Sequence, residues 1–116
     1  MGRGSWELIH RLAAKFPKQP TKEQIEDASQ FFSILSRLYP CEDCAQHFRG
    51  LLKTNPVRAS SNSELSVWAC EAHNAVNKRN NKTLFNCSLD SLSEKWGDCG
   101  CFEKKNVTNK DDPESS

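Results

Sequence analysis

Apolar residues recur at steps of three or four positions in four separate segments, and this period is that of an amphipathic helix. The first segment, "SWELIHRLAAKF", ends at Pro17 and Pro20. Its apolar residues are Trp6, Ile9, Leu12, Ala13 and Phe16. Thr21 and Gln24 form a predicted capping box for a second helix. The inward stripe expected for that helix is Ile25, Ala28, Phe31, Phe32, Leu35 and Leu38.

Two further helices and a short one complete the predicted fold. A third helix runs from about Cys41 to Leu52, with Phe48 and Leu51 facing inward together with Leu52. Ser61 and Glu64 form a second capping box. The stripe of the fourth helix is Leu65, Trp68, Ala69, Ala72 and Val76, and a short fifth helix covers Asp90 to Trp96. No segment resembles a strand, so the expected fold is all-α, a four-helix bundle with a short fifth helix.

The length and charge of the chain restrict its class. Its 116 residues are enough for one domain with a modest core. We expect this domain over residues 2–98 and a flexible tail over 99–116, because the end of the chain has too little apolar surface to offset the entropy of ordering. A net charge of +1 gives no electrostatic basis for binding nucleic acid or an anionic membrane. The sequence shows neither a signal-peptide pattern nor an apolar run near the ~20 residues of a membrane span.

Six cysteines are many for this length, and their even number favours disulfides in an oxidising compartment over a cytosolic metal site. Cys70 lies on the apolar face of the fourth helix, and Cys87 follows the next turn. We expect a structural disulfide between these two, which would contribute about 3 kcal/mol in the chain-entropy model.

The motif "YPCEDC" places two more cysteines at a predicted helix start. Pro40 is well placed to open the helix, so that Cys41 and Cys44 share one face of its first turns. The helix N-terminus stabilises a thiolate, which predicts a lowered pKa for Cys41 and makes it the nucleophile. Glu42 and Asp43 oppose this effect in charge. The motif alone favours a redox dithiol and a zinc site about equally.

The remaining cysteines, Cys99 and Cys101, form a CxC pair near the end of the chain. A zinc site built from both close pairs is conceivable, whereas His47 and His73 each stand alone. The glycine between Cys99 and Cys101 suits a mobile dithiol better. A thioredoxin-like fold would need strands around the motif, and the sequence predicts none.

Polar residues occupy faces that the helical pattern turns inward. His73 and Asn77 share a face with Cys70, and Trp6 and His10 repeat the pairing of an aromatic ring with a polar side chain on the first helix. The fourth helix also carries Asn74. Cations and another ring are supplied nearby in sequence by Lys78, Lys82, Lys95 and Trp96. Rings, hydrogen-bonding groups and lysines are what an adenine–ribose–pyrophosphate ligand requires. The sequence has no GxGxxG motif, so the ligand would not be held by a Rossmann site.

Taken together, these motifs resemble the Erv/ALR family of FAD-dependent sulfhydryl oxidases over residues 2–101. The matching pieces are "GRGSWELIH", "LYPCEDCAQHF", "WACEAHNAVNKRNNK", the cysteine at position 87 and "KW" at 95–96. The combination is highly specific, although each piece alone is not. The resemblance implies an FAD-binding bundle, usually a homodimer, with the flavin at its mouth beside the CxxC motif.

The resemblance also implies roles for single residues. Cys44 would lie beside the flavin ring, Cys41 would exchange with incoming dithiols, Cys99 and Cys101 would form the shuttle pair, and Cys70–Cys87 would be structural; no metal is implied. The FAD-lining residues would be Gly2, Arg3, Trp6, His10, Tyr39, Cys44, Cys70, His73, Asn74, Val76, Asn77, Lys78, Lys82, Lys95 and Trp96.

The implied reaction passes electrons from a dithiol protein substrate, or an upstream oxidoreductase, through the shuttle pair and the CxxC pair to FAD. The acceptor would be O2, giving H2O2, or cytochrome c. The expected location is the mitochondrial intermembrane space, with the endoplasmic reticulum as the alternative because the tail CxC resembles a secretory-pathway member. The competing hypotheses are a zinc-stapled helical interaction module and a disulfide-rich scaffold without activity.

Overall fold

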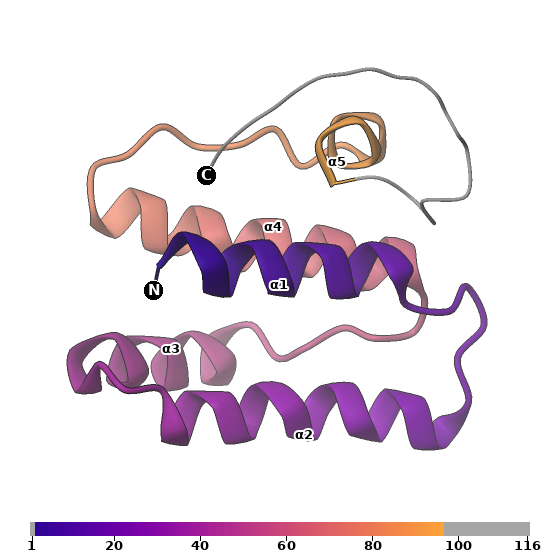
Figure 1. Cartoon of the computed structure of the whole chain (residues 1–116), viewed down its shortest axis with the longest axis horizontal. Helices are drawn as coiled ribbons and strands as arrows, with labels where there is room; N and C mark the ends of the chain where they lie inside the picture. The colour runs from indigo at the N-terminus through magenta and orange to yellow at the C-terminus, as the bar shows by residue number, and fades with distance from the viewer. Residues whose placement is uncertain (1, 97–116) are drawn as a thin grey trace.

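The computed structural model describes residues 2–96, which form five helices and no strand (Figure 1). The helices are α1 (Arg3–Lys15), α2 (Lys22–Leu38), α3 (Glu42–Thr54), α4 (Asn62–Arg79) and α5 (Leu89–Trp96). The predicted all-α class and the five helices are therefore confirmed. Cys99, Cys101 and the predicted tail lie outside the described residues.

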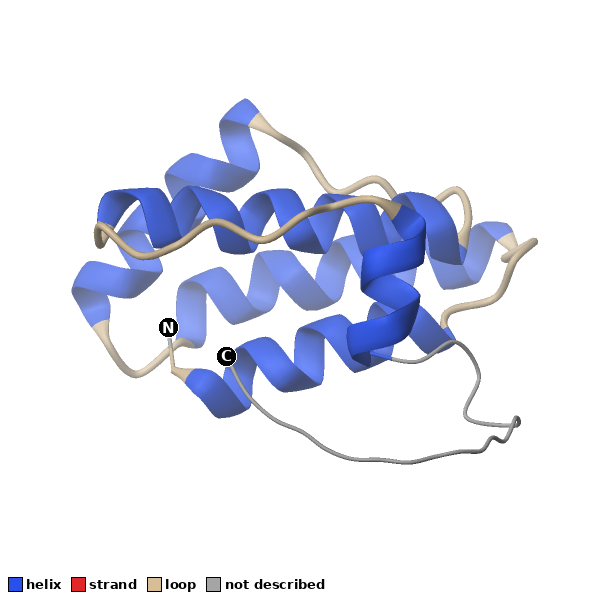
Figure 2. Ribbon diagram, turned by 90° about the horizontal axis from the view of Figure 1, so that it is seen from above, coloured by secondary structure: helices blue, strands red, loops and turns tan. Residues whose placement is uncertain are grey.

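The bundle is built from two helix pairs. α1 packs chiefly against α4, and α2 packs chiefly against α3. α5 lies across α1 and α4 rather than along them (Figure 2). No helix within residues 2–96 is long and apolar enough to cross a membrane.

The helix starts follow the predicted capping chemistry. Thr21 and Gln24 form a complete capping box. Only half of the box predicted at Ser61 forms: its hydroxyl accepts a hydrogen bond from the Glu64 amide at 3.1 Å, whereas the Glu64 carboxylate pairs with Arg58.

α4 ends at Arg79 with Asn80 as its C-cap, and just beyond it the amide of Lys82 bonds the carbonyl of Asn77 and the amide of Asn81 bonds the carbonyl of Lys78. Asn81 has φ 60°, a left-handed conformation that asparagine tolerates better than most residues. These bonds fix where the chain turns toward Lys82.

The core lies between the two helix pairs. Phe32 from α2 packs against Phe48 of α3 and edge-on against Trp68 of α4, with ring centroids 6.5 and 4.8 Å away. The Trp68 indole also donates a hydrogen bond to the carbonyl of Asn55 at 2.8 Å, which holds the α3–α4 connection.

The inward stripe predicted for α2 is wrong at two positions. Leu38 is 75% exposed and Ile25 is 36% exposed, whereas Phe32 and Ala28 are buried. The other helices of the described part of the chain therefore cover only part of the apolar face of α2. Leu8 of α1 and Ile34 of α2 are also exposed, so α1 and α2 both present apolar side chains to the surface.

Candidate functional site

The two cysteines of the CEDC motif lie at the first turn of α3. Cys41 is the N-cap, and its sulfur accepts a hydrogen bond from the Cys44 amide at 3.4 Å. The two Sγ atoms are 2.8 Å apart and unbonded, so a small shift of either side chain closes a disulfide. Cys41 is exposed and Cys44 is half-buried. The pair is therefore open to an incoming thiol through Cys41.

The pKa of Cys41 is lowered because first the side chain and then the backbone amide of Cys44 hydrogen-bond to its sulfur, and the charge of Asp43 opposes this shift. Arginines pair with both acidic residues of the motif. Arg79 at the end of α4 lies 3.1 Å from the Asp43 carboxylate, and Arg49 lies 3.0 Å from that of Glu42. The two arginines thus offset part of the acidic charge of the motif, although the charge of Asp43 still opposes the lowered pKa of Cys41.

We expect Arg79→Gln to raise the pKa of Cys41 toward that of an ordinary thiol, because the Asp43 carboxylate then loses its partner. The measurement is the rate of Cys41 alkylation by iodoacetamide against pH in the reduced protein, followed by peptide mass spectrometry. Lys15→Gln, which removes one positive charge at the far end of α1, is the matched control. An unchanged midpoint in Arg79→Gln contradicts the prediction.

The start of α1 hydrogen-bonds Tyr39, which lies two positions before Cys41. The Tyr39 hydroxyl accepts a hydrogen bond from the Gly2 amide at 3.1 Å, and it lies 3.1 Å from the Ser5 hydroxyl. Trp6 follows Ser5 directly and points into the bundle. One turn of α1 therefore connects the dithiol segment to the buried residues described next.

Trp6, His10, His73 and Trp96 form the imidazole–indole cluster of this site. Trp6 stacks on His73 with centroids 4.2 Å apart and planes 4° from parallel. His10 stacks on Trp96 at 4.3 Å and 3°. The two imidazoles join the stacks through a 2.8 Å hydrogen bond between His10 Nε2 and His73 Nδ1. Three helices, α1, α4 and α5, thus contribute rings to one cluster.

Burial keeps both imidazoles of the cluster neutral. The pKa of His10 is lowered from 6.5 to about 3 by burial first, then by His73 and Lys95. The pKa of His73 is lowered from 6.5 to about 4 by burial first, then by Lys82 and Lys95. The pKa of His47 is also lowered, by burial first and then by the charge of Arg79.

These shifts predict acid sensitivity. Above about pH 6.5 both histidines are neutral in the folded and unfolded chain, but below it only the unfolded chain takes up protons readily, so stability falls with pH. We expect the free energy of unfolding to drop by about 2–3 kcal/mol between pH 6.5 and 5. Urea unfolding at a series of pH values measures this. His47→Gln is the control that keeps most of the dependence, and equal urea midpoints at both pH values contradict the prediction.

The residues around the cluster fit an aromatic ligand with phosphate groups. Asn77 is 6% exposed, yet its side-chain amide makes no hydrogen bond within residues 2–96. A buried amide without a partner is uncommon, so the side chain of Asn77 is a candidate to hydrogen-bond a ligand. Lys95 places its ammonium 5.2 Å from the Phe85 ring and 5.3 Å from that of Trp96. Lys78, Lys82, Gly2 and Arg3 are exposed, and Val76 is buried.

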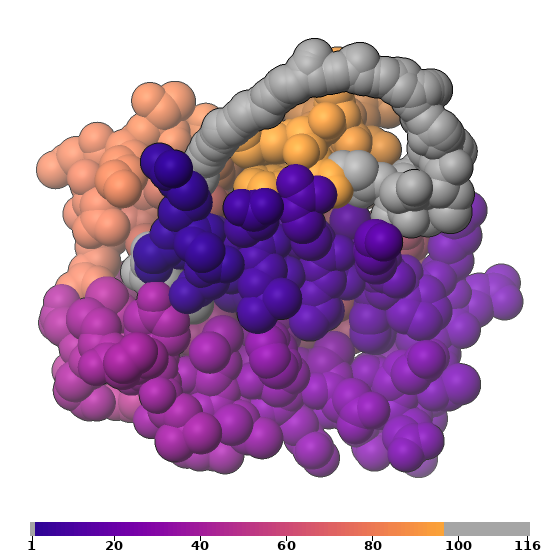
Figure 3. Space-filling view, in the orientation of Figure 1, coloured from indigo at the N-terminus to yellow at the C-terminus, as the bar shows by residue number. Residues whose placement is uncertain are grey.

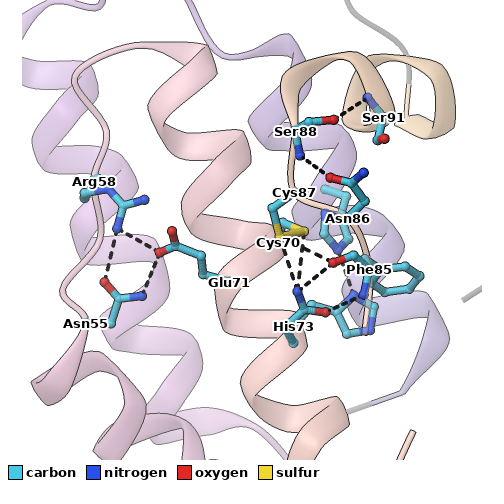
Figure 4. Close-up of a disulfide and its surroundings, with 12 residues drawn as sticks. Asn55, Arg58, Cys70, Glu71, His73, Phe85, Asn86, Cys87, Ser88 and Ser91 are labelled. Atoms are coloured by element: carbon cyan, nitrogen blue, oxygen red, sulfur yellow. Dashed lines mark hydrogen bonds and ion pairs between the residues drawn. A yellow bond between two sulfur atoms is a disulfide. The ribbon is translucent and has the colours of Figure 1, made fainter. Parts of the chain in front are cut away.

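Asn74 hydrogen-bonds the segment that precedes α5. Its amide nitrogen donates to the Phe85 carbonyl at 3.0 Å and to Cys87 Sγ at 3.3 Å, and its oxygen accepts from the Phe85 amide at 2.7 Å. Cys70 and Cys87 are joined by a disulfide beside these bonds (Figure 4). The disulfide and Asn74 together fasten the segment before α5 onto α4, and Phe85 is brought against His73, with ring centroids 4.7 Å apart.

A cleft of about 510 Å³ lies between α1, the start of α4 and α5. It shares only His10 and Trp96 with the residues expected to line a ligand. Its other lining residues are Ala14, Lys18, Ser61, Asn62, Ser63, Ser66, Leu89, Asp90, Leu92 and Ser93.

The model of the Erv1/Alr family matches residues 3–97. The chain belongs to this family. Relatives of this Erv1/Alr chain include the FAD-linked sulfhydryl oxidase ERV1 of rice, 45% identical over 104 residues, which are 90% of this chain and 53% of the relative. The mitochondrial FAD-linked sulfhydryl oxidase ERV1 of Saccharomyces cerevisiae is 42% identical over 98 residues, which are 84% of this chain and 51% of the relative. The chain thus spans about half the length of the curated relatives it matches.

Solved Erv1 structures have the same fold. The crystal structure of the yeast Erv1 core has a TM-score of 0.80 at 42% identity, covering 84% of this chain and 80% of that one. The FAD-binding domain of Erv1 from Saccharomyces cerevisiae has a TM-score of 0.80 at 42% identity, covering 84% of this chain and 91% of that one. These agreements fix the fold of the Erv1/Alr chain.

Three residues of this Erv1/Alr chain contribute to the site without having been predicted. Ser5 contacts Tyr39, Arg79 pairs with Asp43, and Phe85 packs against both the cluster and Lys95. Ser5 and Arg79 are ordinary surface residue types in the sequence, which gave no signal for them. Phe85 precedes Cys87 by two positions, so the expected disulfide could have drawn attention to it.

Proposed function

We propose that this protein is an FAD-dependent sulfhydryl oxidase that forms disulfide bonds, with the overall reaction dithiol + O2 → disulfide + H2O2. One arrangement carries the proposal. The start of α1 links the dithiol segment, through Tyr39, to the buried cluster containing Trp6 and His73. The names of the FAD-linked relatives and the FAD-binding Erv1 domain support it.

The dithiol performs the exchange step. A substrate thiolate attacks the exposed Cys41 sulfur of a Cys41–Cys44 disulfide, the S–S bond breaks, and Cys44 leaves as a thiolate. The second substrate thiol then displaces Cys41, so the substrate departs as a disulfide and both cysteines are reduced. The lowered pKa of Cys41 makes it a good leaving group in this second step.

The residues proposed to hold FAD are those of the cluster together with Gly2, Arg3, Tyr39, Cys44, Cys70, Asn74, Val76, Asn77, Lys78, Lys82 and Lys95. FAD, when bound, supplies the two-electron oxidation of the dithiol and the transfer of electrons to O2 or to a one-electron carrier such as cytochrome c. The indoles of Trp6 and Trp96 cover the imidazoles on which they stack and exclude water from them. The side-chain amide of Asn77, which has no partner within residues 2–96, offers a donor and an acceptor. Cys44 is proposed as the thiol that faces the flavin, since it is the more buried of the pair.

Location and assembly extend the proposal. Two yeast relatives, ERV1 of Saccharomyces cerevisiae and erv1 of Schizosaccharomyces pombe, are named mitochondrial, which supports a mitochondrial location, and we propose the intermembrane space. We also propose a homodimer. The exposed side chains of Leu8, Ile25, Ile34 and Leu38 all belong to α1 and α2, whose indigo and purple atoms occupy much of one face in Figure 3.

The first experiment is a visible absorption spectrum of the purified protein, before and after a dithiol is added under nitrogen. We expect flavin bands that bleach on reduction and return in air. If the protein is colourless, FAD is added back. A protein that still binds no FAD is not a flavoenzyme, and the zinc hypothesis is then tested by metal analysis.

The shuttle role of the tail is a separate prediction. We expect Cys99→Ser/Cys101→Ser to lose most turnover with a protein dithiol yet keep most of it with dithiothreitol, because the small thiol reaches Cys41 directly. Steady-state oxygen consumption with both substrates measures this. Equal losses with both substrates contradict the shuttle assignment.

A further inference from the structure

The hydrogen bond between His10 and His73 is the most enclosed polar contact at the site. His10 is 2% exposed and His73 is 3% exposed, and their bond joins α1 to α4 across 63 positions of sequence. Trp6 stacks on His73 and Trp96 stacks on His10, so each ring plane is fixed by an indole. The rings therefore have little freedom to turn and exchange their nitrogens.

Both rings are neutral at neutral pH, for the reasons given above. A neutral imidazole carries one hydrogen, on either Nδ1 or Nε2. Lys82 and Lys95 are the cations that oppose protonation. The pair thus holds two ring hydrogens, one of which lies between His10 Nε2 and His73 Nδ1.

Because the two rings share one hydrogen bond, the tautomer of His10 determines the tautomer of His73. If His10 donates from Nε2, then His73 accepts at Nδ1 and carries its own hydrogen on Nε2. If His73 donates from Nδ1, then His10 accepts at Nε2 and carries its hydrogen on Nδ1. In both cases the two rings have the same tautomer, and the outer nitrogens, His10 Nδ1 and His73 Nε2, have opposite polarity. Neither outer nitrogen makes a hydrogen bond within the described part of the chain.

We propose that the bonded pair rests in one of these two states, in which His10 is a positioning residue that locks the tautomer of His73 and gives His73 Nε2 one fixed hydrogen-bonding polarity toward bound FAD. The flavin half of this inference rests on the proposed function, whereas the tautomer lock is a property of the chain by itself. Flavin then binds to a ring whose hydrogen is already in place.

The lock is tested by nitrogen-15 NMR of the histidine rings in the FAD-free protein. The chain has only three histidines, so His47→Gln assigns the remaining signals and serves as the matched control. We expect His10 and His73 to show the same single tautomer. In His10→Phe, which keeps a ring against Trp96 but removes the nitrogens, His73 becomes a mixture of tautomers. Different tautomers in the two wild-type rings, or a His73 spectrum unchanged in His10→Phe, overturns the lock.

The flavin half is tested by titrating FAD into the same proteins. We expect His10→Phe to bind FAD about tenfold more weakly, the size of one misdirected hydrogen bond, and His47→Gln to bind as the wild type does. If His10→Phe does not fold, as judged by circular dichroism, His10→Gln replaces it, and the wild-type spectrum still decides the lock. Unchanged FAD affinity in a folded variant overturns the positioning role alone. A wild-type protein that binds no FAD overturns the proposed function, while the ring spectra still decide the lock.

Discussion

Replacing Cys44 with serine is expected to abolish dithiol oxidation while the protein stays folded. A serine hydroxyl cannot form a disulfide with Cys41, so a substrate thiolate has no S–S bond to break, and both exchange and electron transfer stop. We expect turnover with dithiothreitol to fall by at least ~10³-fold. Oxygen consumption measures the rate, and the visible spectrum measures how much FAD the variant retains.

The control for this variant lies two positions further along α3. Gln46→Ala removes an exposed polar side chain from the same helix and is expected to keep wild-type turnover. Cys41→Ser is expected to be as inactive as Cys44→Ser, because the exchange disulfide needs both sulfurs. Substantial turnover in Cys44→Ser would remove the dithiol from the mechanism.

The second large effect concerns stability. We expect Cys70→Ala/Cys87→Ala to lower the free energy of unfolding by about 3 kcal/mol, since the disulfide closes a loop of seventeen residue steps. For a domain of this size, the loss corresponds to a fall in Tm of roughly 10–20 °C. Calorimetry of the FAD-free protein measures it, which keeps ligand binding out of the comparison.

The design of this experiment must prevent disulfide exchange. The variant and its control therefore both carry Cys41→Ser/Cys44→Ser, so that on heating neither of these two thiols can attack the intact Cys70–Cys87 disulfide of the control. Thr83→Ala, an exposed change in the segment that the disulfide closes, is the matched control. The hydrogen bonds of Asn74 to Phe85 remain in every variant. A Tm within a few degrees of the control would show that Asn74 alone holds this segment.

The helices could be predicted from the sequence because the formation and the ends of each helix depend on residues close together in the sequence. Periodicity and the capping residues Thr21 and Ser61 place the helices to within a few residues. Burial is different, since the same stripe on α2 contains the buried Phe32 and the exposed Leu38. An apolar pattern indicates which face is apolar, and only the packing of the other helices decides how much of that face is covered.

The same distinction holds for the site: its residue types could be predicted from the sequence, and the contacts between them could not. The residue types of the cluster were evident in the sequence, but the hydrogen bond between His10 and His73 joins residues of two helices that meet only in the fold. The ion pair between Arg79 and Asp43 is likewise set by where α4 ends. Asn74 shows the same limit, because nothing in the sequence indicates that its side chain also bonds the backbone of Phe85 and lies against the sulfur of Cys87.

The division of the bundle into two helix pairs has a consequence for the order of folding. α2 and α3 are neighbours in sequence and carry the dithiol at their junction, whereas α1 and α4 must close a long stretch of chain before they meet. Pairs that are close in sequence form sooner, because less loop entropy opposes them. A newly made chain is therefore expected to present its reactive thiols before the imidazole–indole cluster exists, and added FAD is expected to accelerate only the last kinetic phase of refolding.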